Sequence, residues 1–361
     1  MIEAIESAIS SGNYSEAAQL VQQLDPQDPW TLLYLGKVHE AQQQWDDAEA
    51  AYRDLLRQSQ GPKLTLAARQ GLQRLQDQRT QDRKASIAQA IASPEKAELG
   101  VLVLEAVAME AKKEAAQHMA QIMNIDAYAA RMLLPSKGVR LYRSGPIGEL
   151  EFYGQQLNNQ GIPAFWIPLS ALRRVTVYPV CYFESFENLA GVVAQSNSSE
   201  QDTLSLKFSW TDVTRRVEGQ LPIFEEVVER DRRGKLLRKE QTQDHAQFCD
   251  LHLPKQNCIL RFSDAGYQFH RGASLDTIES SQSSLSQNTA WANWRLIKQI
   301  FDQKLPKTVV DNDFNSFAET AMDHPDLLDK IPAHINLFRR AETNWDPAFQ
   351  LYSSLLFLHQ D

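Results

Sequence analysis

The spacing of apolar residues changes three times along this 361-residue chain, and each change predicts a different kind of element. In the first part, apolar side chains recur every three or four positions, which predicts amphipathic helices. The second part mixes short apolar runs with helical periods, the third carries strand-like alternation, and the fourth returns to a helical period. The pattern therefore predicts a multi-domain α+β chain with boundaries at 1–80, 86–170, 171–275 and 289–361.

The first part repeats itself. Tyr14 and Trp45 are 31 residues apart, as are Ala17 and Ala48. Small residues such as Gly36 and Ala48 suit positions where two antiparallel helices approach closely. A third copy is only half present, because Gly71 follows Gly36 by 35 residues in a helix over 63–78 and no matching second helix comes after it. The polar run QDQRTQDRK at 76–84 is interpreted as a linker.

This spacing resembles the tetratricopeptide superfamily, whose helix-turn-helix units repeat about every 34 residues. The resemblance covers about 80 residues, and the alternative is a plain bundle of helical hairpins. It implies that the chain holds another protein, as a peptide or a helix, in a groove lined by the first helix of each pair. The residues expected to touch such a partner are Trp30, Leu33, Lys37, Glu40 and Arg69. For Leu33 the alternative role is packing on a neighbouring helix.

The second part predicts a small sandwich with the order strand, helix, helix, strand, helix, strand. Gly100–Val107 is an apolar run typical of a buried strand, although a helix start remains open, and Asp126 is a good cap for a short helix through Leu134. This βααβαβ order resembles the C-terminal domain of the large ribosomal stalk protein, a small domain that binds other proteins. A generic ferredoxin-like sandwich of similar layout is the alternative.

The third part predicts an antiparallel β domain, either a small barrel or a pleckstrin-like sheet. Its clearest strand is Thr203–Trp210, whose apolar residues alternate with polar ones. A tract of serine and glutamine at 279–288 is too polar to bury surface and is interpreted as a second linker. A C-terminal helical domain follows, with helices expected at 291–300, 314–322, 327–339 and 348–358.

Composition narrows the class of protein. The apolar fraction of 43% and the charged fraction of 23% are typical of a folded globular chain. A net charge of −9 disfavours nucleic acid as a partner. Three cysteines are too few for a disulfide framework, and the chain carries neither an 18-residue apolar run nor a basic signal segment at its start. These features predict a cytoplasmic location and leave room for peripheral membrane contact.

One basic run in the β part suggests an alternative function. Arg230, Arg232, Arg233 and Lys235 could contact RNA or lipid headgroups, and the chain would then be a regulatory module that binds an anionic ligand through its β domain. Acidic neighbours dilute the run, and charged hairpins also serve to blunt sheet edges.

Metal and cofactor signatures are weak. His245, Cys249, His252 and Cys258 include the residue types that zinc prefers, but they lack the tight pair of a knuckle turn, and strand alternation places His252 on the face opposite to Cys249. Buried thiols and surface imidazoles are the simpler interpretation. No metal and no cofactor are therefore expected.

The sequence contains none of the common catalytic motifs, namely the nucleophile, phosphate-loop, zinc-protease and dinucleotide patterns. We expect no enzyme, although an acid and a base can come from distant residues. The favoured function is a non-catalytic adaptor or assembly and regulatory factor. The segments GQLPIFEEVVERDRRGKL and NWDPAFQLYSSLLFL loosely resemble cyanobacterial tetratricopeptide-containing proteins of unassigned role, which implies assembly or regulation of a photosynthetic complex.

Overall fold

The computed structural model describes residues 2–26, 28–58, 61–196, 199–230, 236–275, 289–337, 339 and 343–359. Of residues 199–201, 225–230 and 236–241 it describes the backbone only. The chain divides into two compact units, Met1–Ala90 and Ile91–Asp361. The segments expected to form three separate domains after residue 86 thus belong to one unit.

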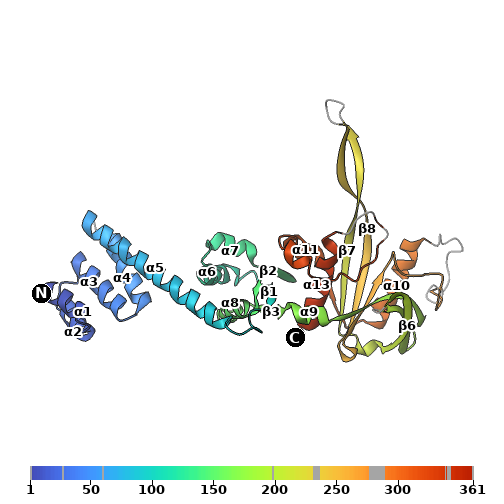
Figure 1. The fold of residues 1–361 in the computed structure, drawn as a ribbon, viewed down its shortest axis with the longest axis horizontal. Coiled ribbons are helices and arrows are strands. Elements are labelled where there is room, and N and C mark those ends of the chain that lie inside the picture. Colours follow the sequence, from blue (N-terminus) through green and yellow to red (C-terminus); the bar gives the residue numbers. More distant parts are fainter. Residues whose placement is uncertain are drawn as a thin grey trace. The chain divides into compact units, whose positions relative to one another are not determined.

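The described part of the first unit consists of helices (Figure 1). They are α1 (Ile2–Ser10), α2 (Tyr14–Gln22), α3 (Pro29–Ala41), α4 (Trp45–Gln58) and α5 (Pro62–Ala90). Consecutive helices pack as antiparallel pairs, α1 with α2 and α3 with α4. The third pair is incomplete, as the sequence indicates, because α5 is followed by a strand rather than by a second helix.

The turns inside the two helix pairs repeat with the sequence period. Gly12 and Gln43, 31 residues apart, both have a left-handed backbone, with φ of 77° and 60°. The next amide in each turn closes the same hydrogen bond, from Asn13 N to the Ala8 carbonyl and from Gln44 N to the His39 carbonyl, both 2.9 Å long. The repeat is therefore present in the backbone conformation as well as in the residue types.

The polar run at 76–84 is helical, which corrects its interpretation as a linker. It contains no Gly or Pro, and its Gln, Arg and Lys residues are good helix formers. Gln78 hydrogen-bonds Asp82 one turn later, and Arg79 forms ion pairs with Asp46 and Glu49 on α4. The polar surface of α5 suits the end of a helical solenoid, where the terminal repeat must face water.

The second unit begins with the expected βααβαβ order. Its elements are β1 (Leu99–Glu105), α6 (Lys112–Met123), α7 (Ala127–Leu133), β2 (Val139–Pro146), α8 (Ile147–Asn159) and β3 (Ala164–Pro168). The strands form an antiparallel sheet in the order β2-β1-β3. Asp126 caps α7 as the sequence predicts, because its carboxylate accepts the backbone N–H groups of Tyr128 and Ala129.

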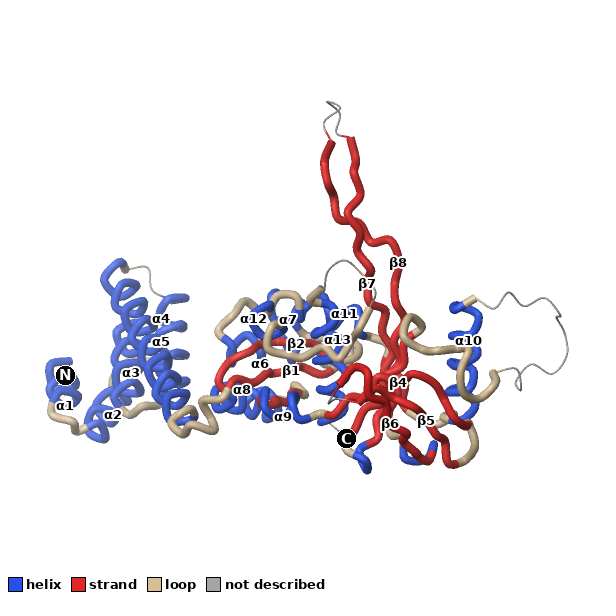
Figure 2. Tube along the Cα trace, turned by 45° about the vertical axis from the view of Figure 1, so that its right-hand side comes forward, coloured by secondary structure: helices blue, strands red, loops and turns tan. Residues whose placement is uncertain are grey.

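A seven-stranded sheet follows, in the order β10-β7-β8-β9-β4-β5-β6. Its strands are β4 (Thr176–Ser185), β5 (Leu189–Ser196), β6 (Ser199–Ser209), β7 (Arg215–Arg230), β8 (Leu236–Leu253), β9 (Cys258–Ser263) and β10 (Val309–Asp311). Most neighbours pair antiparallel, but β4–β9 and β10–β7 are parallel. In the described residues the sheet ends at β10 and β6, so it is open rather than closed into a barrel. The β7–β8 ribbon extends well beyond the other strands (Figures 1 and 2).

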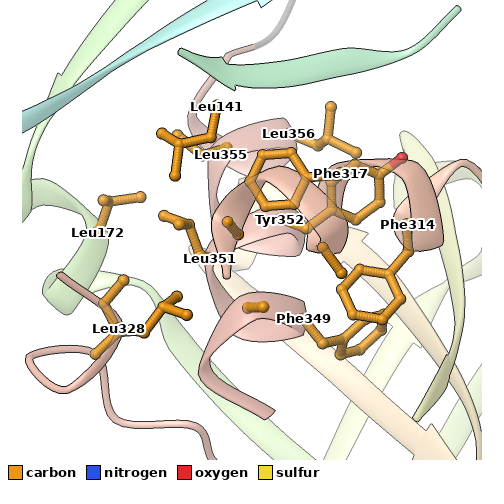
Figure 3. Packing of buried hydrophobic residues seen from close by; sticks show 14 of the residues in the cluster. Leu141, Leu172, Phe314, Phe317, Leu328, Phe349, Leu351, Tyr352, Leu355 and Leu356 are labelled. Atoms are coloured by element: carbon orange, nitrogen blue, oxygen red, sulfur yellow. The ribbon is translucent and has the colours of Figure 1, made fainter. Parts of the chain in front are cut away.

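Helix α13 (Trp345–Leu358) lies between the two sheets and forms the centre of the unit (Figure 3). On one side Leu355 and Leu356 share a cluster with Leu141 of the three-stranded sheet, and on the other Phe349 packs on Phe248 of β8. Gly219 of β7 leaves room for Phe349, because a Cβ there would lie 2.5 Å from the ring. The C-terminal helices therefore complete a shared core and do not form a domain of their own.

Helix α10 (Ala290–Lys304) covers the opposite face of the large sheet through a second buried cluster. The expected helices at 314–322 and 348–358 correspond to α11 (Phe314–Ala321) and α13. The helix expected over 327–339 is wrong: α12 spans only Pro325–Leu328, and the described residues after it are irregular. Pro332 explains the difference, since proline disfavours the helical conformation of Ile331, and His334 adopts a left-handed φ of 52°.

Candidate protein-interaction face

Tyr52 joins the first unit's helices at the point where they come closest. Its side chain is fully buried, and a Cβ on Gly36 of α3 would lie 2.6 Å from one edge of its ring. A Cβ on Gly71 of α5 would lie 2.5 Å from the other edge. The two glycines, 35 residues apart in sequence, therefore hold one aromatic ring between the first helices of successive repeats.

The hydroxyl of Tyr52 donates to Glu40 Oε2 at 2.6 Å. Glu40 also accepts two hydrogen bonds from Arg74 of α5, at 2.7 and 2.9 Å. Burial alone would raise the pKa of the Glu40 carboxyl, but the hydrogen bonds from Arg74 and Tyr52 lower it below its usual value. The same burial and the Glu40 carboxylate raise the pKa of Tyr52. Glu40 is thus a charged link between α3 and α5.

A second polar group connects α3 to α1. The Tyr34 hydroxyl donates to Glu6 Oε1 at 3.0 Å, and burial together with this bond raises the pKa of Tyr34 to about 12. Lys37 lies 3.6 Å from the same carboxylate and 5.0 Å from the centre of the Tyr34 ring. Trp30 stacks on Tyr34, and the Lys63 ammonium of α5 lies 5.6 Å from the Trp30 ring. These contacts and the Glu40–Arg74 pair join α1, α3 and α5 along one side. This side is called here the α1–α3–α5 face, and its residues are Glu6, Trp30, Tyr34, Lys37, Glu40, Lys63 and Arg74.

The five residues expected to contact a partner differ in how exposed they are in the structure. Leu33 is 4% exposed and packs with Tyr52, so it belongs to the core and is not available to a partner. Trp30 and Lys37 are half-buried on the α1–α3–α5 face, and Glu40 is held by Arg74 and Tyr52. Arg69 on α5 is exposed, but it lies on the opposite flank of that helix from Lys63 and Arg74, across the buried residues Ala68, Gly71 and Leu75.

Three residues of this face were missed in the sequence, namely Glu6, Lys63 and Arg74. A signal for one of them was present, because Arg74 follows Glu40 by 34 residues, one repeat length, and opposite charges at that distance indicate a bridge between successive first helices. No comparable signal marks Lys63, whose position depends on where α5 begins.

The basic run gives no site that the structure can describe. Arg232, Arg233 and Lys235 lie outside the described residues, and Arg230 is described by its backbone alone, which pairs with Leu236 in the β7–β8 ribbon. The proposed anion contact stays a prediction.

The zinc candidates of the second unit do not form a site. Across the described residues, no group of three or more His, Cys, Asp or Glu side chains is arranged to hold a metal ion. Cys249 belongs to the cluster under α10, whereas His252 on the other face shares a hydrogen bond of 3.0 Å with Ser353 of α13. Burial lowers the pKa of His252 to about 3 and raises that of the Cys258 thiol to about 11.

The His252–Ser353 contact resembles a base and nucleophile pair in its residue types alone. His252 is 1% exposed and Ser353 is 0% exposed, so a substrate has no path to either atom. Nearby, Arg261 and Asp250 form a buried ion pair at 2.9 and 2.7 Å, and Arg261 also donates to the Ala333 carbonyl. These polar groups attach α13 and the segment before it to the large sheet.

Comparison with known proteins finds a match within the first unit. Residues 8–69 match the tetratricopeptide repeat family, which confirms the resemblance of the N-terminal part. No curated protein and no solved structure matches the chain, so the likenesses to cyanobacterial proteins and to the ribosomal stalk domain stay predictions. Across the described residues, none of the helices combines the length and apolar character needed to cross a bilayer.

Proposed function

We propose that the α1–α3–α5 face binds a segment of another protein and that the chain acts as a non-catalytic adaptor, in the assembly or regulation of a larger complex. The observation that carries this proposal is the match of residues 8–69 to the tetratricopeptide repeat, a family that typically binds proteins. The glycine contacts around Tyr52 add to it, because they set the close helix spacing that such a repeat requires.

The face offers a rigid base with adaptable side chains on it. Trp30 is held by Tyr34 and Lys63, and an aromatic side chain with few free torsions is a favourable contact for a peptide. Lys37 and Lys63 supply positive charge on α3 and α5. A bound segment that carries both an apolar and an acidic side chain would use all three residues.

The non-catalytic role is part of the proposal. It draws support from the burial of the His252–Ser353 pair, which leaves that pair of suitable residue types without access to substrate.

The proposal is tested by affinity capture with the full chain as bait. A Lys37→Glu/Lys63→Glu double variant reverses two charges of the face at side chains outside the buried core, and we expect it to lose the captured partners. Arg57→Glu is the matched control, because Arg57 is a 76% exposed cation on the second helix of a pair, away from the face. A chain of residues 91–361 gives the unit-level control.

Two outcomes of the capture experiment would contradict the proposal or move the binding site. If the partners persist after residues 1–90 are removed, the repeats do not hold them and the proposal is wrong. If they are lost with residues 1–90 but retained by the double variant, binding uses another surface of the first unit.

A further inference from the structure

The second unit carries a group of exposed apolar side chains near α7. Met109 is 67% exposed, Tyr128 is 74% exposed and Met132 is 63% exposed. Tyr128 and Met132 are four residues apart on α7 and so share one face of the helix. Met109 lies beside the chain that leaves α7, since its sulfur accepts a hydrogen bond from Ser136 Oγ at 3.9 Å. These three residues are called the α7 patch.

Folding does not require apolar residues at these positions. Helix α7 packs inward through Ala130, which is 0% exposed, and the chain after it buries Leu134 at 1% exposed. A polar side chain at 128 or 132 would therefore leave the core unchanged. Large apolar side chains grouped on a surface indicate a site of interaction.

Basic groups surround the patch. The Lys112 ammonium donates to Ser136 Oγ at 2.7 Å, next to Met109, and Arg140 donates to the Met132 carbonyl at 3.0 Å. Arg131 is exposed on α7. Residues 109–140 contain five Lys or Arg against three Asp or Glu, whereas the whole chain has a net charge of −9. One of the three acids, Asp126, is engaged as the cap of α7.

We infer that the α7 patch binds an acidic protein segment that carries at least one large apolar side chain. Charge complementarity selects an acidic partner, because basic groups beside an apolar patch attract acidic segments and repel basic ones. Methionine side chains are flexible and polarizable, and Tyr and Arg are enriched among residues that dominate binding energies. The patch belongs to the second unit, whereas the α1–α3–α5 face belongs to the first.

A protein segment fits these residues better than an anionic membrane surface does. Stable attachment to a membrane needs a large apolar face on an amphipathic helix or a covalent lipid in addition to basic residues. Helix α7 has seven residues and presents two of the three apolar side chains. The described acids Glu110 and Glu114 would weaken attraction to a uniformly negative surface, while a peptide can be positioned to avoid them.

The test measures binding of the full chain to defined probes by fluorescence anisotropy. The first probe is a labelled 15-residue peptide of Asp and Glu with one Leu and one Phe, and its matched twin replaces each acid by Lys. Vesicles that contain phosphatidylserine form the third arm. We expect the acidic peptide to bind and its basic twin not to bind. A Tyr128→Ser/Met132→Ser variant should weaken binding about tenfold or more, the loss typical of a residue that anchors an interface.

Controls separate this site from others. Leu189→Ser removes another exposed apolar side chain, 57% exposed on β5, and should leave the affinity unchanged. Arg131→Glu should weaken binding of the acidic peptide and make that binding less dependent on salt concentration. The Lys37→Glu/Lys63→Glu variant should bind normally, so failure of the proposed repeat function and failure of this inference are distinguishable. Equal binding of both peptides, no binding of the acidic one, wild-type affinity of the Tyr128/Met132 variant, or binding of vesicles alone would each overturn the inference.

Discussion

Glu40 and Arg74, 34 residues apart and on successive first helices of the repeats, form two hydrogen bonds of 2.7 and 2.9 Å. The Glu40 carboxylate also accepts a hydrogen bond from the Tyr52 hydroxyl. The ring of Tyr52 fills the space left by Gly36 and Gly71. The Glu40 carboxylate therefore helps to hold α3, α4 and α5 together and also contributes a negative charge to the α1–α3–α5 face. Its protonation would weaken the contacts and remove that charge.

Glu40→Gln should destabilise the first unit by about 1 kcal/mol at neutral pH, because a charge-assisted bond to a half-exposed arginine is lost. The pKa of Glu40 is lowered by folding, so its stabilisation is complete above the unfolded pKa and is lost as the pH falls through the folded pKa. The variant should lose less stability on acidification than the wild type. Thermal unfolding of residues 1–90, followed by circular dichroism from pH 7 to pH 3, measures both effects. Parallel pH profiles would contradict the assignment.

Gly36→Ala should destabilise the same unit, by about 1 to 3 kcal/mol. In an ordinary helix interior this substitution stabilises by about 1 kcal/mol, since Gly is a poor helix former. Here the new methyl group would lie 2.6 Å from the Tyr52 ring, and α3 would have to move away from it. Urea denaturation of residues 1–90 gives the sign of the effect. A stabilised variant would show that the ring can shift without cost.

Gln43→Gly should have the opposite effect and stabilise the first unit by about 1 kcal/mol. Gln43 has a φ of 60°, which L residues with a Cβ adopt at a cost, whereas Gly12 occupies the equivalent turn without one. Gln42→Gly is the control, because it adds chain flexibility at a neighbouring position whose φ is −82°. Thermal midpoints that rise for the first variant and fall for the second are the expected result.

His252 should make the second unit sensitive to mild acid. Burial lowers its pKa to about 3, so the folded state holds it neutral while the unfolded chain takes up a proton below about pH 6.5. The contribution of neutral His252 to the free energy of unfolding is complete above pH 6.5 and decreases as the pH falls towards 5. His252→Gln keeps a hydrogen-bonding side chain opposite Ser353 and should flatten the stability profile between pH 7.5 and 5. The lowered pKa values of His324 and His334 add to the slope that remains.

Local signals in the sequence predicted most elements correctly. The periodic apolar positions located the repeats, Asp126 marked the start of α7, and alternation located β6. The helix expected over 327–339 failed because the apolar period there continued through Pro332, where the backbone cannot follow it. The polar run at 76–84 was misinterpreted because its helix is stabilised by side-chain pairs and by α4 rather than by an apolar face.

Long-range arrangement was less accessible to the sequence. The parallel pairing of β4 with β9 joins segments about 80 residues apart, and no local pattern indicates it. For the candidate face, the roles of Trp30, Lys37 and Arg69 in binding stay predictions, and the sequence could not separate an exposed Leu33 from a buried one. Leu33 is buried because Tyr52 of α4 packs against it, and this contact between two helices is not visible in the sequence.

The position of α13 has a consequence for the order in which the protein folds during synthesis. Both sheets precede α13 in the chain, and both turn apolar residues toward it. The ribosome must therefore release residue 358 before this core can close, whereas the two core clusters of the first unit are formed by residues 5–75, which emerge much earlier. Nascent chains arrested before Trp345 should resist protease over the repeats and be cut within the sheets, which would leave those strands dependent on chaperones until α13 is synthesised.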